Sequence, residues 1–209
     1  MLYEFLQSRY HPNEPIFLSD IQLAGISDQC LQAQIKKLTD SGLLKQFDTG
    51  IYFFPKKSIF RSGAQMSMSQ VIEQKYLRDQ KMRCGYLCGF WLANQLGLTT
   101  QVPMVFEVVS NKATTEYQET AIAKTRVILR KPRVPITEQN WAVLQFLDLM
   151  MDIDQYVEVN KDRCTVLLTQ HMKRTGITFS QMEEYLPLYP DNVFRNMYAS
   201  GLLHGVSPY

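Results

Sequence analysis

The sequence predicts an α+β fold in two domains. A chain of 209 residues is long enough for one large domain or two small ones, and its 45% hydrophobic and 20% charged residues are typical of globular proteins. Near residue 60 the composition changes from Ser, Gly and Met to a charged amphipathic pattern, which places the domain boundary there. We expect residues 1–60 to combine three short helices with a β-hairpin. Residues 61–209 are expected to be mostly helical, with a small, mostly antiparallel sheet.

The first domain begins with a helix. Apolar residues stand at helical spacing near the N-terminus, and the two prolines of HPNEP (11–15) end that helix. A short β-like run, IFL (16–18), comes next. A brief second helix is expected over residues 19–25, with Ser19 as its N-cap and Gly25 at its end.

A third helix follows, and it carries the main candidate site. Ser27 is its expected N-cap, and Gly42 ends it. Helical spacing divides the segment into an apolar face of Leu31, Ile35 and Leu38 and an opposite face of Gln29, Gln32, Ala33 and Lys36. The apolar face should pack on the domain, so we expect the second face to point outward.

After this helix the sequence predicts a β-hairpin. The strands LLKQFD (43–48) and IYFF (51–54) are joined by the tight turn Thr49-Gly50, and Pro55 ends the second strand. Three short helices, with a small strand before the second and a hairpin after the third, follow the order of a winged helix-turn-helix domain. In that architecture the third helix lies in the DNA major groove and the hairpin touches the backbone or minor groove beside it.

The polar residues of these segments suit DNA. The amides of Gln29 and Gln32 can bond adenine bidentately, and Lys36 can reach guanine or a phosphate. The predicted DNA-binding residues are Ser27, Gln29, Gln32, Ala33, Lys36, Lys45, Gln46, Thr49, Lys56 and Lys57. The alternative is that this face is only solvated or docks a protein. Asp28 favours that alternative, because its carboxylate repels phosphate unless it accepts a hydrogen bond from cytosine N4.

The second domain mixes helices and strands. A helix is expected over residues 85–96, where two glycines four positions apart let another element's backbone approach closely. MVFEVVS (104–110) predicts a central strand, and residues 118–124 and 125–132 predict two more. Thr137 is the expected start of an apolar helix, TEQNWAVLQFLDLMMDI, and helical hairpins complete the chain.

Positive charge concentrates in the middle of the chain. The net charge is only +2, but residues 69–135 carry 10 Lys and Arg against 5 Asp and Glu. In the strand at 125–132, alternation puts two arginines on one side. The basic cluster of Arg126, Arg130, Lys131 and Arg133 is a candidate surface for an acidic partner or nucleic acid. Protection of an edge strand against aggregation explains it equally well.

The sequence carries no common catalytic motif. The phosphate-cradling loops, nucleophile elbow and zinc-protease pair are absent from it, and the carboxylates Asp152 and Asp154 follow a helix rather than a strand. His171 resembles a solvated or dipole-paired imidazole near a helix end. The four cysteines, among them Cys84 and Cys88 one helical turn apart, are expected to be reduced core thiols. We therefore predict a binding protein rather than an enzyme, without metal or cofactor.

The location of the protein can also be predicted. The N-terminus shows neither a secretory signal nor a transit peptide. The longest strongly apolar stretch, residues 85–98, is shorter than a bilayer requires. These observations predict a cytoplasmic protein with no membrane partner.

Four segments of the chain carry a family resemblance. They are GIYFFP (50–55), GYLCGFWLANQLGLTTQVP (85–103), a strand ending in SNK (110–112), and NWAVLQFLDLM (140–150). With the N-terminal winged-helix pattern, they make residues 1–150 similar to the AbiEi-type antitoxins of type IV, abortive-infection toxin–antitoxin systems.

The resemblance implies two activities. In this family a winged helix represses the antitoxin's own operon, and a C-terminal domain neutralises a nucleotidyltransferase-like toxin encoded beside it. Carried over to this chain, the DNA-reading helix is Ser27 to Leu38 and the wing is Leu43 to Phe54. The expected partners are double-stranded operator DNA, typically an inverted repeat bound by two protomers, and a cognate toxin. Two alternatives stay open: a ligand-responsive transcriptional regulator with a metabolite pocket, and an enzyme that uses Asp152 and Asp154.

Overall fold

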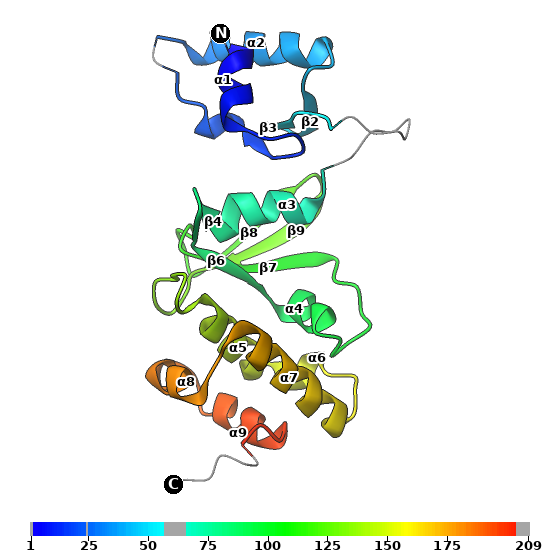
Figure 1. Cartoon of the computed structure of the whole chain (residues 1–209), viewed down its shortest axis with the longest axis vertical. Helices are drawn as coiled ribbons and strands as arrows, with labels where there is room; N and C mark the ends of the chain where they lie inside the picture. The colour runs from blue at the N-terminus through cyan, green and yellow to red at the C-terminus, as the bar shows by residue number, and fades with distance from the viewer. Residues whose placement is uncertain (1, 24, 57–65, 204–209) are drawn as a thin grey trace. The chain divides into compact units, whose positions relative to one another are not determined.

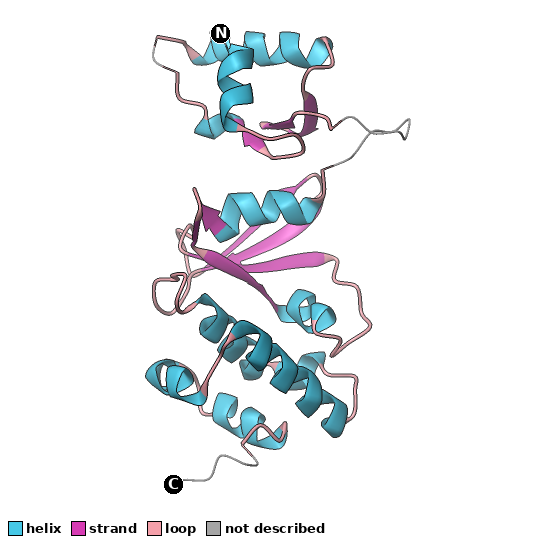
Figure 2. Cartoon of the chain, in the orientation of Figure 1, coloured by secondary structure: helices cyan, strands magenta, loops and turns pink. Residues whose placement is uncertain are grey.

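The computed structural model describes residues 2–23, 25–56 and 66–203. The chain divides into two compact units, Met1–Lys75 and Tyr76–Tyr209 (Figure 1). The predicted α+β class is confirmed, since helices and strands occur in both units (Figure 2). The boundary predicted near residue 60 falls among residues 57–65, outside the described part of the chain.

The first unit contains the predicted order of elements with one exception. Its described elements are α1 (Leu2–Arg9), β1 (Ile16–Phe17), the 3₁₀ turn η1 (Leu18–Asp20), α2 (Asp28–Asp40), β2 (Lys45–Asp48), β3 (Ile51–Phe53) and α3 (Met68–Ile72). The exception is the helix predicted over 19–25, which is only the turn η1. The Ser19 hydroxyl donates to the carboxylate of Asp20 (2.9 Å) instead of capping a helix, and Ile21 is already extended.

Helix α2 begins and ends as its sequence predicts. The Ser27 side chain accepts a hydrogen bond from the backbone N–H of Cys30 (3.3 Å). At the other end Gly42 has φ +74°, a conformation that glycine adopts without strain. The chain then turns so that the N–H groups of Leu43 and Leu44 both reach the carbonyl of Leu38.

The strands of the first unit form an antiparallel sheet in the order β1-β3-β2 within the described residues. Gly50 has φ +75° in the tight turn between β2 and β3. A core of buried side chains joins the sheet to α1 and α2: Leu2, Leu6, Ile16, Ile21, Leu31, Ile35, Leu44 and Phe54. The hairpin is thereby fixed against the inner face of α2.

The second unit is a sheet with helices packed against it. The π-helical turn η2 (Glu73–Leu77) leads into it. Its further described elements are β4 (Arg78–Asp79), β5 (Met82–Arg83), β6 (Gly85–Cys88), α4 (Gly89–Gln95), β7 (Val105–Ser110), β8 (Tyr117–Ile122), β9 (Thr125–Arg130), α5 (Trp141–Met151), α6 (Ile153–Tyr156), α7 (Lys161–Thr175), α8 (Phe179–Tyr185), η3 (Leu186–Leu188) and α9 (Asn192–Ala199). Among the described helices, none is both long and apolar enough to cross a membrane.

The main sheet is mostly antiparallel, as predicted, but its central strand pair is parallel, so the sheet is mixed. Its strand order is β6-β7-β9-β8, and β7 and β9 run parallel while both outer pairs are antiparallel (Figure 2). The chain reverses after β7 and again between β8 and β9, so β9 returns in the direction of β7. The second reversal is a tight turn in which Ala123 and Lys124 both have positive φ, as two-residue hairpins require.

The helix predicted over residues 85–96 is wrong in its first half, because Gly85–Cys88 form the strand β6. Backbone crowding explains this, since a Cβ on Gly85 would lie 2.5 Å from the carbonyl oxygen of Tyr76 and 2.8 Å from that of Val109. The close approach expected at Gly85 therefore occurs, but between the strand β6 and its neighbours η2 and β7. Gly89 then turns the chain into α4 with φ +63°.

Helix α5 is the centre of the second core. It lies against α4, α8, α9 and β6, and residues 142–150 are all buried. It begins at Trp141 rather than at Thr137, because the Asn140 side chain accepts a hydrogen bond from the backbone of Thr137 (2.8 Å) and holds that segment as a turn. Leu144 and Leu147 are buried as predicted, while Trp141 at the helix start is only half-buried.

The SNK segment at the end of β7 connects three parts of the second unit. The Ser110 hydroxyl donates to the carbonyl of Tyr76 (2.5 Å), and the Lys112 ammonium donates to that of Arg78 (2.5 Å). The Asn111 side chain both donates to and accepts from the backbone of Ile136 (2.8 and 2.9 Å), as a paired peptide group would. These bonds connect the end of β7 to η2, to β4 and to the segment before α5.

The GLTTQVP segment is also anchored by a side chain from a distant part of the sequence. The Glu158 carboxylate accepts hydrogen bonds from the backbone and hydroxyl of Thr100 (2.8 and 3.1 Å) and from the Gln101 amide (2.7 Å). The N–H of Glu158 donates to the carbonyl of Leu98 (2.9 Å). The bond from the Thr100 backbone, followed by those from Gln101, lowers the pKa of Glu158 from 4.5 to about 2.

We expect Glu158→Gln to lower the melting temperature at neutral pH. The folded pKa lies below the unfolded one, so the stabilisation is complete above pH 4.5 and is lost as pH falls toward about 2. The difference in melting temperature between the native protein and the variant should therefore shrink across this window in a calorimetric pH series. Glu184→Gln, at an exposed position of α8, is the matched control, and a difference that stays constant with pH would contradict the assignment.

Candidate functional site

The outer face of α2 is open to solvent in the described structure. Leu31 and Ile35 are 8% and 2% exposed, whereas Gln29, Gln32, Ala33 and Lys36 are all exposed. The side chains of Gln29, Gln32 and Lys36 form no hydrogen bond or ion pair with a described residue. The two faces of this helix are therefore those that the spacing of its apolar residues predicted. Its 13 residues span about 20 Å, which exceeds the width of the DNA major groove.

The start of α2 can still interact with an anion. The Ser27 oxygen accepts a bond from the Cys30 N–H, but its own O–H proton is not used in that cap. Asp28 is exposed in the first helical turn, where its carboxylate repels a phosphate. Its carboxylate restricts the neighbouring contacts to groups that donate hydrogen bonds.

Three exposed residues of α2 were not predicted: Cys30, Lys37 and Asp40. Lys37 lies on the outer side of the helix, six residues from Leu31, and the same helical spacing that placed Lys36 could have found it. Cys30 was expected among the core thiols, and that prediction is wrong because it is exposed. The other three cysteines, Cys84, Cys88 and Cys164, are free and buried.

The hairpin beside α2 adds a second set of polar groups. Lys45, Gln46 and Thr49 are exposed on β2 and its turn, and Lys56 is exposed just after β3. The Gln46 amide donates to the carbonyl of Asp48 (3.3 Å), and the Lys45 ammonium has no partner among the described residues. The remaining residue of the predicted set, Lys57, lies outside the described part.

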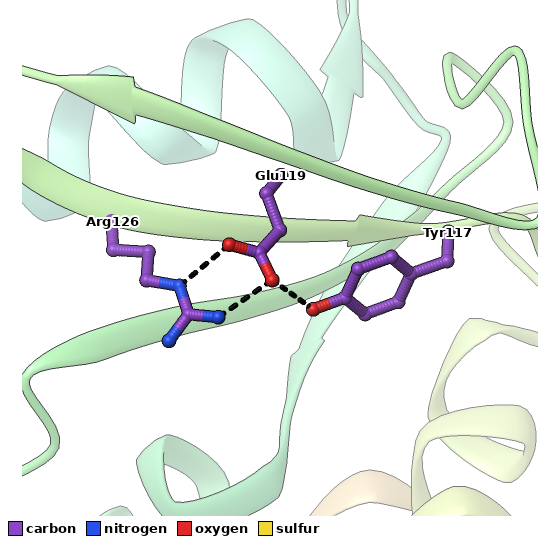
Figure 3. A network of polar contacts seen from close by, with 3 residues as sticks. All are labelled: Tyr117, Glu119 and Arg126. Atoms are coloured by element: carbon purple, nitrogen blue, oxygen red, sulfur yellow. Dashed lines mark hydrogen bonds and ion pairs between the residues drawn. The ribbon is translucent and has the colours of Figure 1, made fainter.

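In the second unit, Arg126 belongs to an exposed polar network (Figure 3). Its guanidinium donates twice to the Glu119 carboxylate, from Nε (2.9 Å) and from Nη2 (2.6 Å). The Tyr117 hydroxyl donates to the same carboxylate (2.5 Å). Hydrogen bonds from Arg126 and Tyr117 lower the pKa of Glu119, and the bond to Glu119 raises that of Arg126. Arg126 thus offers a neutralised pair rather than a free positive charge.

Arg130 has a different environment although it lies on the same face of β9. It is half-buried, its Nη2 donates to the sulfur of Cys88 (3.1 Å), and its Nε is buried without a hydrogen-bond partner among the described residues. Burial raises the pKa of the Cys88 thiol to about 12, so the sulfur is neutral. The Arg130 guanidinium therefore forms no ion pair with this neighbour.

Three of the four predicted basic residues converge on one cleft, while Arg126 lies apart in its own network. The cleft has a volume of about 210 Å³ and is lined by Val109, Glu116, Arg130, Lys131, Pro132, Arg133 and Asp148. The Lys131 side chain is exposed, and the Arg133 guanidinium stacks on the Tyr189 ring (4.7 Å) while donating to the carbonyl of Leu188 (2.9 Å). Three cationic side chains of the second unit therefore lie together at the end of β9.

Asp148 is part of this cleft and was missed by sequence reasoning. It is 9% exposed on α5 and accepts a hydrogen bond from the Tyr86 hydroxyl (2.9 Å). Burial raises the pKa of its carboxyl, although Arg130 and Tyr86 act in the opposite direction. A signal was present in the sequence, because Asp148 is the one acidic residue within the apolar run WAVLQFLDLMM.

The two carboxylates considered for catalysis, Asp152 and Asp154, lie at the start of α6. Asp152 precedes α6 and accepts a bond from the Gln155 amide (3.3 Å), and Asp154 is exposed. Within the described ranges, no group of three or more His, Cys, Asp and Glu side chains is placed to hold a metal ion. His171 is 5% exposed, which corrects the solvated imidazole expected there, and burial followed by the charge of Arg174 lowers its pKa to about 4.

Comparison with known proteins adds no relative. No protein-family model matches the chain, and no curated protein matches it. The resemblance to AbiEi-type antitoxins therefore rests on the four sequence segments and the N-terminal pattern that suggested it.

Proposed function

We propose that the protein is a DNA-binding transcriptional regulator whose first unit is a winged helix. The observation that carries the proposal is the outer face of α2, on which two glutamine amides and a lysine ammonium are exposed and unpaired. The exposed residues of the β2–β3 hairpin add further hydrogen-bonding and positively charged groups. The antiparallel order β1-β3-β2 and the helix before it support the winged-helix assignment.

The chemistry of α2 matches a DNA major groove. A glutamine amide offers one donor and one acceptor, which is the pair that the N7 and N6 atoms of adenine require, and each such pair contributes about 1–3 kcal/mol of base discrimination. Lys36 and Lys37 add positive charge beside these amides. On the hairpin, Lys45 and Thr49 are suited to phosphate contacts, which position the protein without reading sequence.

Occupation of a promoter by this unit would repress transcription. Two protomers on an inverted repeat would place two α2 helices about one helical turn of DNA apart. The function proposed here is therefore binding rather than catalysis, and the operon that encodes the protein is its expected target by analogy with the antitoxin family.

For the second unit we propose neutralisation of a nucleotidyltransferase-like toxin, on the basis of the same resemblance. The segments that carry it, including SNK and GLTTQVP, serve as structural anchors in this unit, as Asn111 and Glu158 show. The exposed charged residues at β8 and β9 are the surface suggested for the toxin. They include Arg126 with its partner Glu119, and Lys131 and Arg133 near the cleft.

Replacement of Gln32 and Lys36 together by alanine should abolish operator binding. Both side chains point away from the core, so the variant should keep the melting temperature of the native protein while losing base and phosphate contacts. Electrophoretic mobility shifts with the promoter of the protein's own operon measure the effect. Lys81→Ala, at an exposed position of the second unit, is the control for loss of one positive charge. Unchanged shifts by the double variant would refute the assigned face.

Lys45→Gln should weaken binding to operator and to unrelated DNA by similar factors. A lysine that contacts phosphate contributes counterion release but no base recognition. The slope of log K against log salt concentration should therefore become less steep by about 0.9 for each bound protomer. Fluorescence anisotropy over a salt series tests this. A loss confined to the operator, with the slope unaltered, would assign Lys45 to base reading instead.

Reversal of Arg126 and Lys131 to glutamate should impair toxin neutralisation and leave DNA binding intact. Both positions are exposed, so reversal changes the charge of the surface without opening the core. Growth of cells that co-express the toxin encoded beside the gene reports neutralisation, and mobility shifts report DNA binding. Lys173→Glu, exposed on α7, is the matched control. Full rescue of growth by the double reversal would exclude this surface.

A further inference from the structure

The cleft at the end of β9 contains a half-buried cation, Arg130, which forms no ion pair within the described residues although the Asp148 and Glu107 carboxylates lie near enough to act on its charge. Arg130 forms one hydrogen bond to the neutral sulfur of Cys88, and its Nε has no partner among the described residues. A charge removed from water costs several kcal/mol unless it is paired and hydrogen-bonded. An unsatisfied buried polar group in a native protein calls for a reason, and an absent ligand is one such reason.

Two further cations face the same space. The Lys131 ammonium has no hydrogen bond or ion pair within the described residues. Arg133 uses two of its five N–H donors, one on the carbonyl of Leu188 and one toward the sulfur of Met151 (3.5 Å), so three donors are left. Its stacking on Tyr189 holds the guanidinium plane in place.

Carboxylates lie near these cations but are not paired with Arg130 or Lys131 in the described structure. Glu116 is exposed among the lining residues, and Asp148 is enclosed and bonded to Tyr86. Glu107 is a third carboxylate whose charge acts on Arg130. None of the three forms an ion pair with Arg130 or Lys131 within the described residues, so the donors of these two cations stay open to an anion that enters the cleft.

We propose that this cleft binds the terminal phosphate of a small phosphomonoester, with the Arg130 guanidinium as the central donor and Lys131 and Arg133 beside it. Planar guanidinium groups bind phosphate oxygens bidentately, and a terminal phosphate carries close to two negative charges at neutral pH. A volume of about 210 Å³ accepts a phosphate with a small organic group, since one liquid water occupies about 30 Å³. A phosphodiester carries a single charge and two substituents, so it fits this cleft less well.

This inference goes beyond DNA binding and toxin neutralisation. Arg130 is paired across the sheet with Val109, which in turn pairs with Tyr86, the donor to Asp148. A phosphate on Arg130 would therefore change the charge balance around a residue of the central helix α5. A small phosphorylated molecule would in this way act on the core of the second unit, as a ligand-responsive regulator requires.

Isothermal titration calorimetry of the full chain with adenosine 5′-monophosphate and with inorganic phosphate tests the proposal. Lys131→Ala should weaken binding about tenfold or more, because it removes a charge-assisted contact. Arg130→Met, which keeps an unbranched apolar stem but has no charge and no N–H donor, should remove binding. Asp148→Asn should tighten binding several-fold, because a negative charge beside the anion is lost.

Three controls make the result decisive. Lys173→Ala should bind like the native protein, and thermal unfolding should show that the Lys131 and Asp148 variants are folded. Dimethyl phosphate, a diester, should bind more weakly than inorganic phosphate. The proposal is overturned if the native protein binds neither probe at millimolar concentration, if Lys131→Ala binds as tightly as Lys173→Ala, or if Asp148→Asn binds more weakly than the native protein. Equal binding of the diester would overturn the assignment to a terminal phosphate.

Discussion

The hydrogen bonds at the end of β7 determine the arrangement of the second unit. Ser110, Asn111 and Lys112 each satisfy backbone groups of a segment that is distant in sequence, near Tyr76, Ile136 and Arg78. Because backbone groups buried without partners are costly, these three side chains select one arrangement of β7 relative to the start of α5. Once β7 is placed, its register with β6 and β9 brings Tyr86, Val109 and Arg130 into one row. The cleft forms where this row of residues lies beside Asp148 on α5.

A simpler constraint governs the first unit. Leu31 and Ile35 are buried, and this fixes the rotation of α2 about its own axis, so the side of the helix that faces solvent is set by the core. The N-cap at Ser27 and the left-handed Gly42 then fix where the helix begins and ends. Base recognition by Gln32 or Lys36 would depend on this rotation, because a turn of one residue moves a side chain by about 100° around the helix.

The first unit could be predicted from sequence because its signals are local. Ser27 and Gly42 bound α2, and Gly50 marks the hairpin turn, each within a few residues of the element it shapes. The predictions that failed concern elements whose structure depends on segments distant in the sequence. Gly85 belongs to a strand because the carbonyls of Tyr76 and Val109 approach it, and β9 is parallel to β7 because β8 lies outside it. Likewise the sequence composition predicted the basic cluster, but the position of Asp148 beside it depends on packing between β9 and α5.

The two arginines on one face of β9 show why residue type and spacing do not determine role. Alternation along the strand places Arg126 and Arg130 on the same side, and the register agrees. Arg126 lies in solvent and shares its charge with Glu119, so its interactions are screened and it can be exchanged without opening the core. Arg130 lies partly inside, against a neutral thiol, where an unpaired charge interacts strongly with any anion that enters. A partner that binds this surface would therefore contact Arg126 as half of a neutral ion pair. A ligand that enters the cleft would contact Arg130 as a guanidinium that forms no ion pair.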